Sequence, residues 1–302
     1  MAIVNDTLTI ACGEIYLRDS TGQYQPPFGL AIWNGRQWQL TRVYATGPTG
    51  VVSNLVPRGI WALSTTEIWL ASGGVFRWNG RDVNATPYWI NSFPGNPNPI
   101  WTAGQYAQRV WGSSSQRMYA IGTVGAIAVF DGSTWQRIES GTTADINDIW
   151  GSTDPGSGLR LTLAAASNVA TPGEMKILRI TGQNTVDTIG WVTGRRVNSI
   201  WFRNERKLFT AGGGVFIRGL DMGWQEQIQI PLVYTRRVRG NGINDVFVVG
   251  DFGVVTHFNG VSWRVYPEVA AALYYSCDYN GRSMIAVGER SARAVVLRGH
   301  RN

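Results

Sequence analysis

The stretch from Val238 to Tyr266, VRGNGINDVFVVGDFGVVTHFNGVSWRVY, holds one complete repeat and decides the fold. A second copy, VWGSSSQRMYAIGTVGAIAVFDGSTWQRI, runs from Val110 to Ile138. Both copies align as a β-prone run, a short turn, a run ending in Gly, a tight turn and a third run. An Asn-Gly or Asp-Gly pair and a fourth run with Trp near its start follow. Each copy therefore predicts four antiparallel strands joined by hairpins.

The Asn-Gly or Asp-Gly pair can be followed along the whole chain. Such pairs accept the positive φ angles of a type I′ turn, so we expect that turn between the third and fourth strands. The pairs are Asn34-Gly35, Asn79-Gly80, Asp131-Gly132 and Asn259-Gly260, with weaker equivalents at Thr181-Gly182, Arg218-Gly219 and Arg298-Gly299. Successive glycines are 45, 52, 50, 37, 41 and 39 residues apart. Seven anchors at this spacing are typical of four-stranded propeller blades.

The sequence thus predicts an all-β fold, a single seven-bladed β-propeller domain over residues 1–302. The expected blades are residues 7–45, 58–90, 108–142, 146–190, 197–231, 236–268 and 272–302. The last blade ends just past its third strand, whereas the β-prone run Ala2-Ile3-Val4 has no role in the first blade. We therefore expect residues 2–5 to supply the missing fourth strand and close the ring.

The composition also fits a turn-rich β protein. Charged residues make up only 16% of the chain, whereas Gly (37 residues) and Trp (14) are abundant. A disordered chain would be highly charged and poor in aromatic residues. We expect no membrane insertion, because no apolar run reaches the roughly 18 residues that a span needs. The N-terminus lacks the basic and apolar regions of a secretory signal. The location stays open between a virion, a cell-surface assembly and the cytoplasm.

The repeats resemble those of bacterial and phage β-propeller proteins, which follow the form I/V-W-G-S, D-V-Y/F-A-V-G and F-D/N-G-x-x-W. The resemblance covers most of the chain and is strongest at residues 110–135 and 238–263. Repeats of this kind occur mostly in surface or secreted bacterial proteins without one common activity, and phage particles also carry propellers. The missing secretory signal fits the phage context better.

Long insertions are expected on one face of the propeller, where the second strand meets the third and one blade meets the next. Aromatic side chains gather in the first three insertions. We consider these side chains candidate binding residues, because aromatic groups suit protein interfaces and sugar rings. The candidates are Tyr24, Phe28, Tyr44, Tyr88, Trp89, Phe93 and Trp101. The alternative is that they fold back as lids over the blades.

Arginine dominates the basic residues and gives the chain a net charge of +7, since Lys176 and Lys207 are the only lysines among 27. Guanidinium groups pair well with carboxylates, phosphates and sulfates. The arginines that recur near the start of first strands are Arg58, Arg109, Arg195, Arg196, Arg236 and Arg237. We expect them to attract an anion on the long-loop face, unless they only pair with loop carbonyls and blade carboxylates. No nucleic-acid motif is recognised, which argues against that partner.

The sequence offers little for catalysis. His257 and His300 are the only histidines, so neither a nucleophile–base arrangement nor a metal-ligand cluster can be argued. Asp145 and Asp148 form a spaced acid pair at a strand start, where we expect them to cap loop amides.

Cys12 and Cys277 are the only cysteines. We expect them in the first strands of the first and last blades as small buried core residues, with a disulfide between them as the alternative.

The preferred interpretation is a non-catalytic propeller that needs no cofactor or metal. It would serve as a structural or recognition component of a virion, tail or surface appendage and bind other proteins through the long-loop face. One alternative is a lectin-like module that binds carbohydrate, including anionic glycan. The other is a glycan-cleaving enzyme with paired carboxylates.

Overall fold

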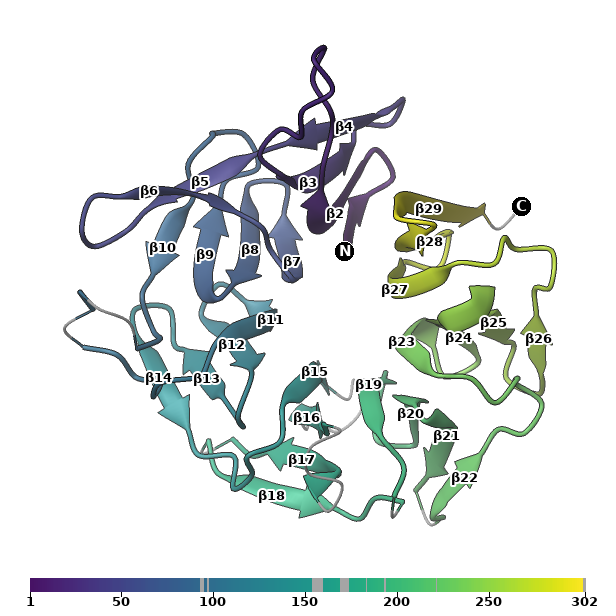
Figure 1. Ribbon diagram of the computed structural model, residues 1–302. Helices are drawn as coiled ribbons and strands as arrows, with labels where there is room; N and C mark the ends of the chain where they lie inside the picture. Colours follow the sequence, from purple (N-terminus) through teal and green to yellow (C-terminus); the bar gives the residue numbers. More distant parts are fainter. Residues whose placement is uncertain are drawn as a thin grey trace. The chain divides into compact units, whose positions relative to one another are not determined.

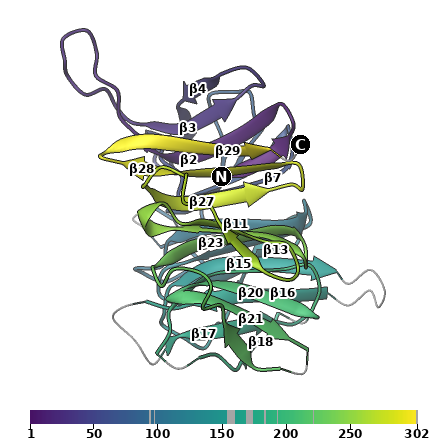
Figure 2. The same ribbon diagram turned by 90° about the vertical axis from the view of Figure 1, so that its right-hand side faces the viewer.

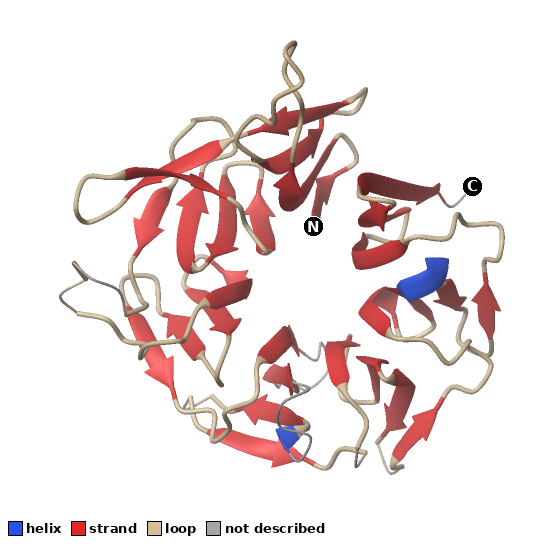
Figure 3. Cartoon of the chain, viewed as in Figure 1, coloured by secondary structure: helices blue, strands red, loops and turns tan. Residues whose placement is uncertain are grey.

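Nearly all regular structure in the computed structural model is β-strand (Figure 3). The structure describes residues 1–92, 95–96, 98–153, 160–168, 174–182, 184–192, 194–220 and 222–300. The chain divides into two compact units, Met1–Ile138 and Glu139–Asn302. In the part of the chain that the structure describes, no helix is long and apolar enough to cross a membrane.

The first unit contains three four-stranded antiparallel sheets and one separate hairpin (Figure 1). The first sheet consists of β1 (Ala2–Asn5), β2 (Leu8–Ile15), β3 (Phe28–Trp33) and β4 (Trp38–Thr41). The second consists of β7 (Gly59–Ser64), β8 (Glu67–Ser72), β9 (Gly74–Trp78) and β10 (Thr86–Tyr88). The third consists of β11 (Ala107–Ser114), β12 (Arg117–Gly122), β13 (Ile127–Phe130) and β14 (Trp135–Ile138). The hairpin is formed by β5 (Val43–Thr46) and β6 (Val52–Leu55).

The second unit contains four antiparallel sheets. The first consists of β15 (Ile146–Thr153), β16 (Arg160–Ala166), β17 (Lys176–Ile180) and β18 (Val186–Ile189). The next consists of β19 (Val197–Phe202), β20 (Lys207–Gly212), β21 (Gly214–Gly219) and β22 (Trp224–Glu226). The sixth sheet of the chain consists of β23 (Thr235–Gly242), β24 (Asp245–Gly250), β25 (Val255–Phe258) and β26 (Trp263–Val265). The seventh consists of β27 (Leu273–Tyr279), β28 (Ser283–Arg290) and β29 (Arg293–His300), which lie side by side in Figure 2. A 3-10 turn, η2 (Asp251–Gly253), follows β24.

The seven sheets correspond in chain order to the seven predicted blades. The prediction that residues 2–5 complete the last sheet is wrong, because β1 pairs with β2, with Ala2 opposite Ile10. Ala2 and Ile10 are buried together with Leu30 in an apolar cluster of the first unit. The short N-terminal run is therefore the first strand of the first sheet, which begins at residue 2 rather than 7.

The turns between third and fourth strands depend on the side chain of their Asn or Asp. The carboxamide oxygen of Asn34 accepts the backbone N–H groups of Arg36 and Gln37, each at 3.0 Å. Equivalent bonds are made by Asn79, Asp131 and Asn259. Positive φ is confined to the glycine, with 91° at Gly35. The predicted type I′ turn is wrong, because it needs positive φ at both central residues.

Every first strand of the second unit carries a β-bulge near its start. A bulge places one extra residue on one strand and re-aims its side chain. The extra residues lie between the paired residues Ile146 and Asp148, Val197 and Ser199, Thr235 and Arg237, and Tyr274 and Ser276. They are Asn147, Asn198, Arg236 and Tyr275.

In β12, β20, β24 and β28, a Gly at or near the end of the strand lies opposite the paired residue that precedes the bulge. A Cβ on Gly250 would lie 2.5 Å from the carbonyl oxygen of Tyr234, and one on Gly288 would lie 1.9 Å from that of Leu273. Real Cβ atoms do not approach an oxygen so closely, so only Gly fits. This contact explains why the repeat has Gly at the end of its second strand.

Candidate functional site

The bulged residues of the second unit reach from one sheet to the next. The side-chain amide of Asn147 donates to the carbonyl of Val197 at 3.4 Å, and that of Asn198 donates to the carbonyl of Arg236 at 2.6 Å. The guanidinium carbon of Arg236 lies 4.9 Å from the ring centre of Tyr275. The repeated bulge thus sets four side chains in one row across four sheets.

Two residues just before the first strands complete this surface. The guanidinium carbon of Arg196 lies 5.0 Å from the ring centre of Tyr234, and that of Arg236 lies 5.4 Å from the same ring. Arg196, Tyr234, Arg236 and Tyr275 therefore alternate, and we call them the arginine–tyrosine row. Burial raises the pKa of Tyr234, although the two guanidinium charges oppose that shift. The ring stays a neutral phenol that can stack with cations at physiological pH.

The turn after β24 adds an acid and an exposed aromatic ring to the row. Arg236 donates through Nε and Nη2 to the two carboxylate oxygens of Asp251. The next residue, Phe252, has φ 56° and 77% of its surface exposed. A left-handed backbone costs stability in a bulky residue, and strained residues of this kind cluster at functional sites.

Arg195, the residue before Arg196, lines a groove. It donates to the Glu226 carboxylate at 3.1 Å and to the carbonyl of Gly213 at 3.2 Å. The groove has a volume of about 610 Å³ and is also lined by Ile228 and Leu232. These two side chains are 88% and 72% exposed, so the groove offers apolar surface beside a paired charge.

Arg237 points instead into a buried ion cluster. Its Nη1 lies 2.7 Å from the carboxylate of Asp148, and Arg239 holds the same carboxylate with Nη1 and Nη2, each at 3.0 Å. The hydroxyl of Ser199 donates to Asp148 at 2.5 Å, and the backbone N–H of Ile200 at 3.1 Å. The anion that Arg237 attracts in this structure is therefore a carboxylate of the chain itself. Asp148 does not cap a loop: it joins β15, β19 and β23.

The remaining predicted arginines lie in the first unit. Arg58 is exposed, and its carbonyl accepts a bond from Nη1 of Arg109 at 2.9 Å. The anion-binding role of the six arginines stays a prediction. Within the second unit, the structure brings together Arg195, Arg196 and Arg236.

Three of the candidate aromatic residues pack inward, against other side chains of the first unit, and do not project from its surface. Trp101 is 1% exposed, and its indole N–H donates to the carbonyl of Ile127. Tyr88 stacks on Trp69 with ring centres 5.3 Å apart. Trp89 meets Phe76 edge to face at 5.6 Å and is half-buried. These residues form the lid that the sequence left as an alternative.

The other candidate aromatic residues have mixed surroundings. Phe28 lies under the guanidinium of Arg42 at 3.7 Å, and Tyr44 is half-buried in β5. Tyr24 is 64% exposed, with the guanidinium of Arg18 4.2 Å from its ring centre. Phe93 lies outside the described residues.

Histidine and cysteine are held in structural contacts. His257 pairs through Nε2 with Asp245 at 2.7 Å. Cys12 and Cys277 are free thiols, so the disulfide alternative is not formed, and Cys12 lies in the second strand of its sheet rather than the first. Burial raises the pKa of the Cys277 thiol to about 12. Among the described residues, no group of three or more His, Cys, Asp and Glu side chains could hold a metal.

Sequence reasoning missed Tyr234, Phe252 and Tyr275. The signal for Phe252 was its place in the repeat, in the tight turn where the third sheet has Val124, which also has positive φ (52°). A bulky apolar residue at a left-handed position is rarely chosen for stability. Tyr275 could not be found, because nothing in the sequence marks the bulge that aims it.

The arrangement of the sheets defines the class of protein. The chain has the fold of a seven-bladed β-propeller, which confirms the predicted fold class. No protein-family model matches it, and no curated protein matches its sequence.

The chain is similar to several solved propeller structures. YCF48 bound to D1 peptide gives a TM-score of 0.64 at 14% identity, covering 100% of this chain and 97% of that one. YCF48 from Cyanidioschyzon merolae gives 0.60 at 15%, covering 97% and 95%. The β-propeller domain of Cps50 (Swd1) from Myceliophteria thermophila gives 0.59 at 11%, covering 96% and 97%. At these identities the likeness concerns the fold alone.

Proposed function

We propose that this propeller is a non-catalytic recognition component of a larger protein assembly, such as a virion, tail or surface appendage. In this proposal the arginine–tyrosine row and Phe252 form the contact with a partner protein. The observation that carries the proposal is Phe252, because it combines positive φ with 77% exposure directly beside Asp251, the ion-pair partner of Arg236.

The composition of this surface supports a protein partner. Arginine and aromatic side chains are enriched in the centres of protein interfaces and dominate binding energy there. A guanidinium that is already stacked on a tyrosine loses little freedom when it binds. The row supplies two such groups, Arg196 and Arg236, at ring distances of 5.0 and 4.9 Å.

Two similarities also support the proposal. The solved structure of YCF48 bound to D1 peptide shows that a propeller similar to this chain in fold can bind a peptide. The repeats resemble those of surface or secreted bacterial propeller proteins, and phage particles also carry propellers. The basic row favours a partner segment that carries carboxylates.

The test uses Phe252→Asn, because Asn tolerates the left-handed backbone that strains Phe. The variant should fold at least as stably as the wild type and lose its partner. The matched control is Val124→Asn, which changes the corresponding turn of the third sheet, where φ is 52° and 44% of the side chain is exposed.

Tagged wild type and both variants would be isolated gently from source cells, and co-purifying proteins quantified by mass spectrometry. We expect one or more proteins in fixed ratio with wild type and Val124→Asn, reduced about tenfold with Phe252→Asn. Isolation of the wild type as a 33.2 kDa monomer would refute the assembly role. Equal partner recovery with all three proteins would refute the assignment of the surface.

A further inference from the structure

The last sheet has an open edge. Six sheets have four strands, whereas the sheet of β27, β28 and β29 has three. β29 pairs with β28 over eight positions, from Ser283 opposite His300 to Arg290 opposite Arg293. Among the described residues, no strand pairs with the other edge of β29. An unpaired edge of this length is a template for another strand.

The geometry of the β28–β29 hairpin fixes which backbone groups face that edge. Its two turn residues, Ser291 and Ala292, have φ of 50° and 59°, as a two-residue type I′ turn requires. The residues that flank such a turn exchange backbone hydrogen bonds, and pairing then alternates along the strand. The N–H and C=O groups of Ala294, Val296 and Arg298 therefore point away from β28.

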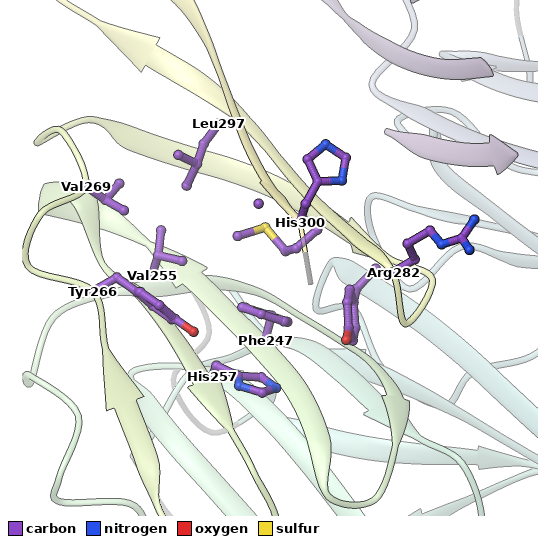
Figure 4. A pocket seen from close by; sticks show the side chains of 11 residues that line it. Phe247, Val255, His257, Tyr266, Val269, Arg282, Leu297 and His300 are labelled. Atoms are coloured by element: carbon purple, nitrogen blue, oxygen red, sulfur yellow. The ribbon is translucent and has the colours of Figure 1, made fainter. Parts of the chain in front are cut away.

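A groove lies where a fourth strand would cover the side of the sheet. In the sixth sheet, β26 brings Trp263 onto Phe258, with ring centres 5.1 Å apart, and completes an apolar cluster. Beside the last sheet there is instead a groove of about 330 Å³. Figure 4 shows the side chains around it, with apolar walls from Val255, Tyr266, Val269, Met284 and Leu297.

The groove and the edge share the same residues of β29. Leu297 and Gly299 line the groove, so every second side chain of an added strand would enter it. Gly299 leaves room there, because a Cβ on it would meet no atom closer than 3.9 Å. An occupant with apolar residues at alternate positions would bury both its backbone and its side chains.

The charge of the β28–β29 hairpin indicates which kind of strand can pair with the open edge. Residues 283–300 contain three arginines and a single acid, Glu289. If two copies of β29 paired in antiparallel fashion, Arg293 of each copy would lie near the end of the other strand that carries Arg298. Like charges on neighbouring strands repel each other and destabilise such a pairing. An acidic strand gains from the same arginines, so the edge favours a different chain over a second copy.

We infer that the outer edge of β29 and the adjoining groove form a strand-addition site for an extended segment of another protein, alternately apolar and acidic. The apolar side chains enter the groove, the carboxylates lie on the opposite face of the sheet, which is the face of Arg298, and the backbone completes the sheet. This site is distinct from the arginine–tyrosine row and does not depend on the proposed function.

The test is a fluorescence anisotropy titration with the labelled peptide Glu-Val-Glu-Leu-Glu-Val. Its control, Glu-Glu-Glu-Val-Leu-Val, has the same composition without alternation. Two variants probe the site independently. Val296→Pro removes an outward N–H from an edge position that tolerates proline, with Val296→Thr as control. Gly299→Leu fills the groove, with Gly299→Ala as control. Melting curves verify that each variant is folded.

We expect the alternating peptide to bind the wild type, Val296→Thr and Gly299→Ala alike, and to bind Val296→Pro and Gly299→Leu at least about tenfold more weakly. Equal binding of the scrambled peptide, no binding to wild type at about 1 mM peptide, or full binding by both blocking variants would overturn the inference. Analytical ultracentrifugation tests whether a second copy of the chain occupies the edge. A wild-type dimer that Val296→Pro abolishes would assign the edge to that second copy and overturn the inference of an acidic partner.

Discussion

Asp148 joins three sheets of the second unit through one buried carboxylate. Its side chain is 2% exposed, and those of Arg237 and Arg239 are 11% and 5% exposed. Asp148→Asn leaves two buried cations without their counter-charge, which we expect to cost about 3 kcal/mol of unfolding free energy. Urea denaturation measures this loss. As control, Asp187→Asn breaks the exposed Arg179 pair and should cost less than about 1 kcal/mol. Equal losses would contradict the role of Asp148.

Because the carboxylate of Asp148 is ionised and paired in the folded protein, we expect the free energy of unfolding to depend on pH. Burial alone would raise the pKa of Asp148, but Arg237 and Arg239 outweigh it and hold the pKa well below the ordinary value. Its contribution is therefore complete above the unfolded pKa of about 4 and is lost as pH falls toward the folded pKa. The wild type should lose more stability between about pH 5 and pH 3 than Asp148→Asn. Parallel curves in denaturant titrations would contradict the assignment.

At the scale of the element, the bulge and its Gly act together. We expect Gly250→Ala to cost more than about 2 kcal/mol, because a Cβ there meets the carbonyl oxygen of Tyr234 at 2.5 Å. Gly223→Ala is the control, since a Cβ at Gly223 meets nothing within 4 Å. Thermal unfolding of the two variants gives the comparison. A stable Gly250→Ala protein would show that the close approach does not constrain the sequence.

Strand β1 should contribute to the stability of the first sheet, because it pairs with β2. Deleting residues 1–6 removes β1, including the buried Ala2, from the first sheet. We expect a lower melting temperature and faster hydrogen exchange in β2, which loses its partner strand. Loss of protection in β29 with β2 unaffected would instead support ring closure by residues 2–5.

Repeat spacing was enough to predict the strands but not every pairing between them. The Asn-Gly and Asp-Gly anchors placed the hairpins, because a turn residue acts locally. The run Ala2-Ile3-Val4 was assigned to the wrong sheet, since its β propensity is the same beside β2 as beside β29. The bulges that aim Arg236 and Tyr275 also escaped prediction, because a bulge depends on register, which composition does not fix.

At the scale of the whole molecule, charge should govern association. The chain carries +7, and basic surfaces accelerate encounter with acidic partners. We expect affinity for the partner to fall about tenfold between about 50 and 300 mM salt, mostly through a slower association rate. Surface plasmon resonance with the isolated partner measures both rates. Affinity independent of salt would contradict an electrostatic contact.

The fold follows from local repeats, whereas the function depends on surfaces that repeats do not encode. The arginines at first-strand starts pointed to the part of the second unit where the arginine–tyrosine row lies. They did not distinguish Arg237, which is tied to Asp148, from Arg236, which stacks on Tyr275. That distinction needs the structure, because successive residues of a strand face opposite sides and the bulge at Arg236 interrupts this alternation.

The most direct test of a partner-binding arginine–tyrosine row is hydroxyl-radical footprinting of the isolated protein and of its native assembly. Phe252 and Tyr275 are 77% and 39% exposed in the chain, so both should be oxidised readily when the protein is alone. We expect both to become protected in the assembly, while Tyr24, 64% exposed in the first unit, stays reactive. Unchanged oxidation of Phe252 and Tyr275 in the intact assembly would contradict it.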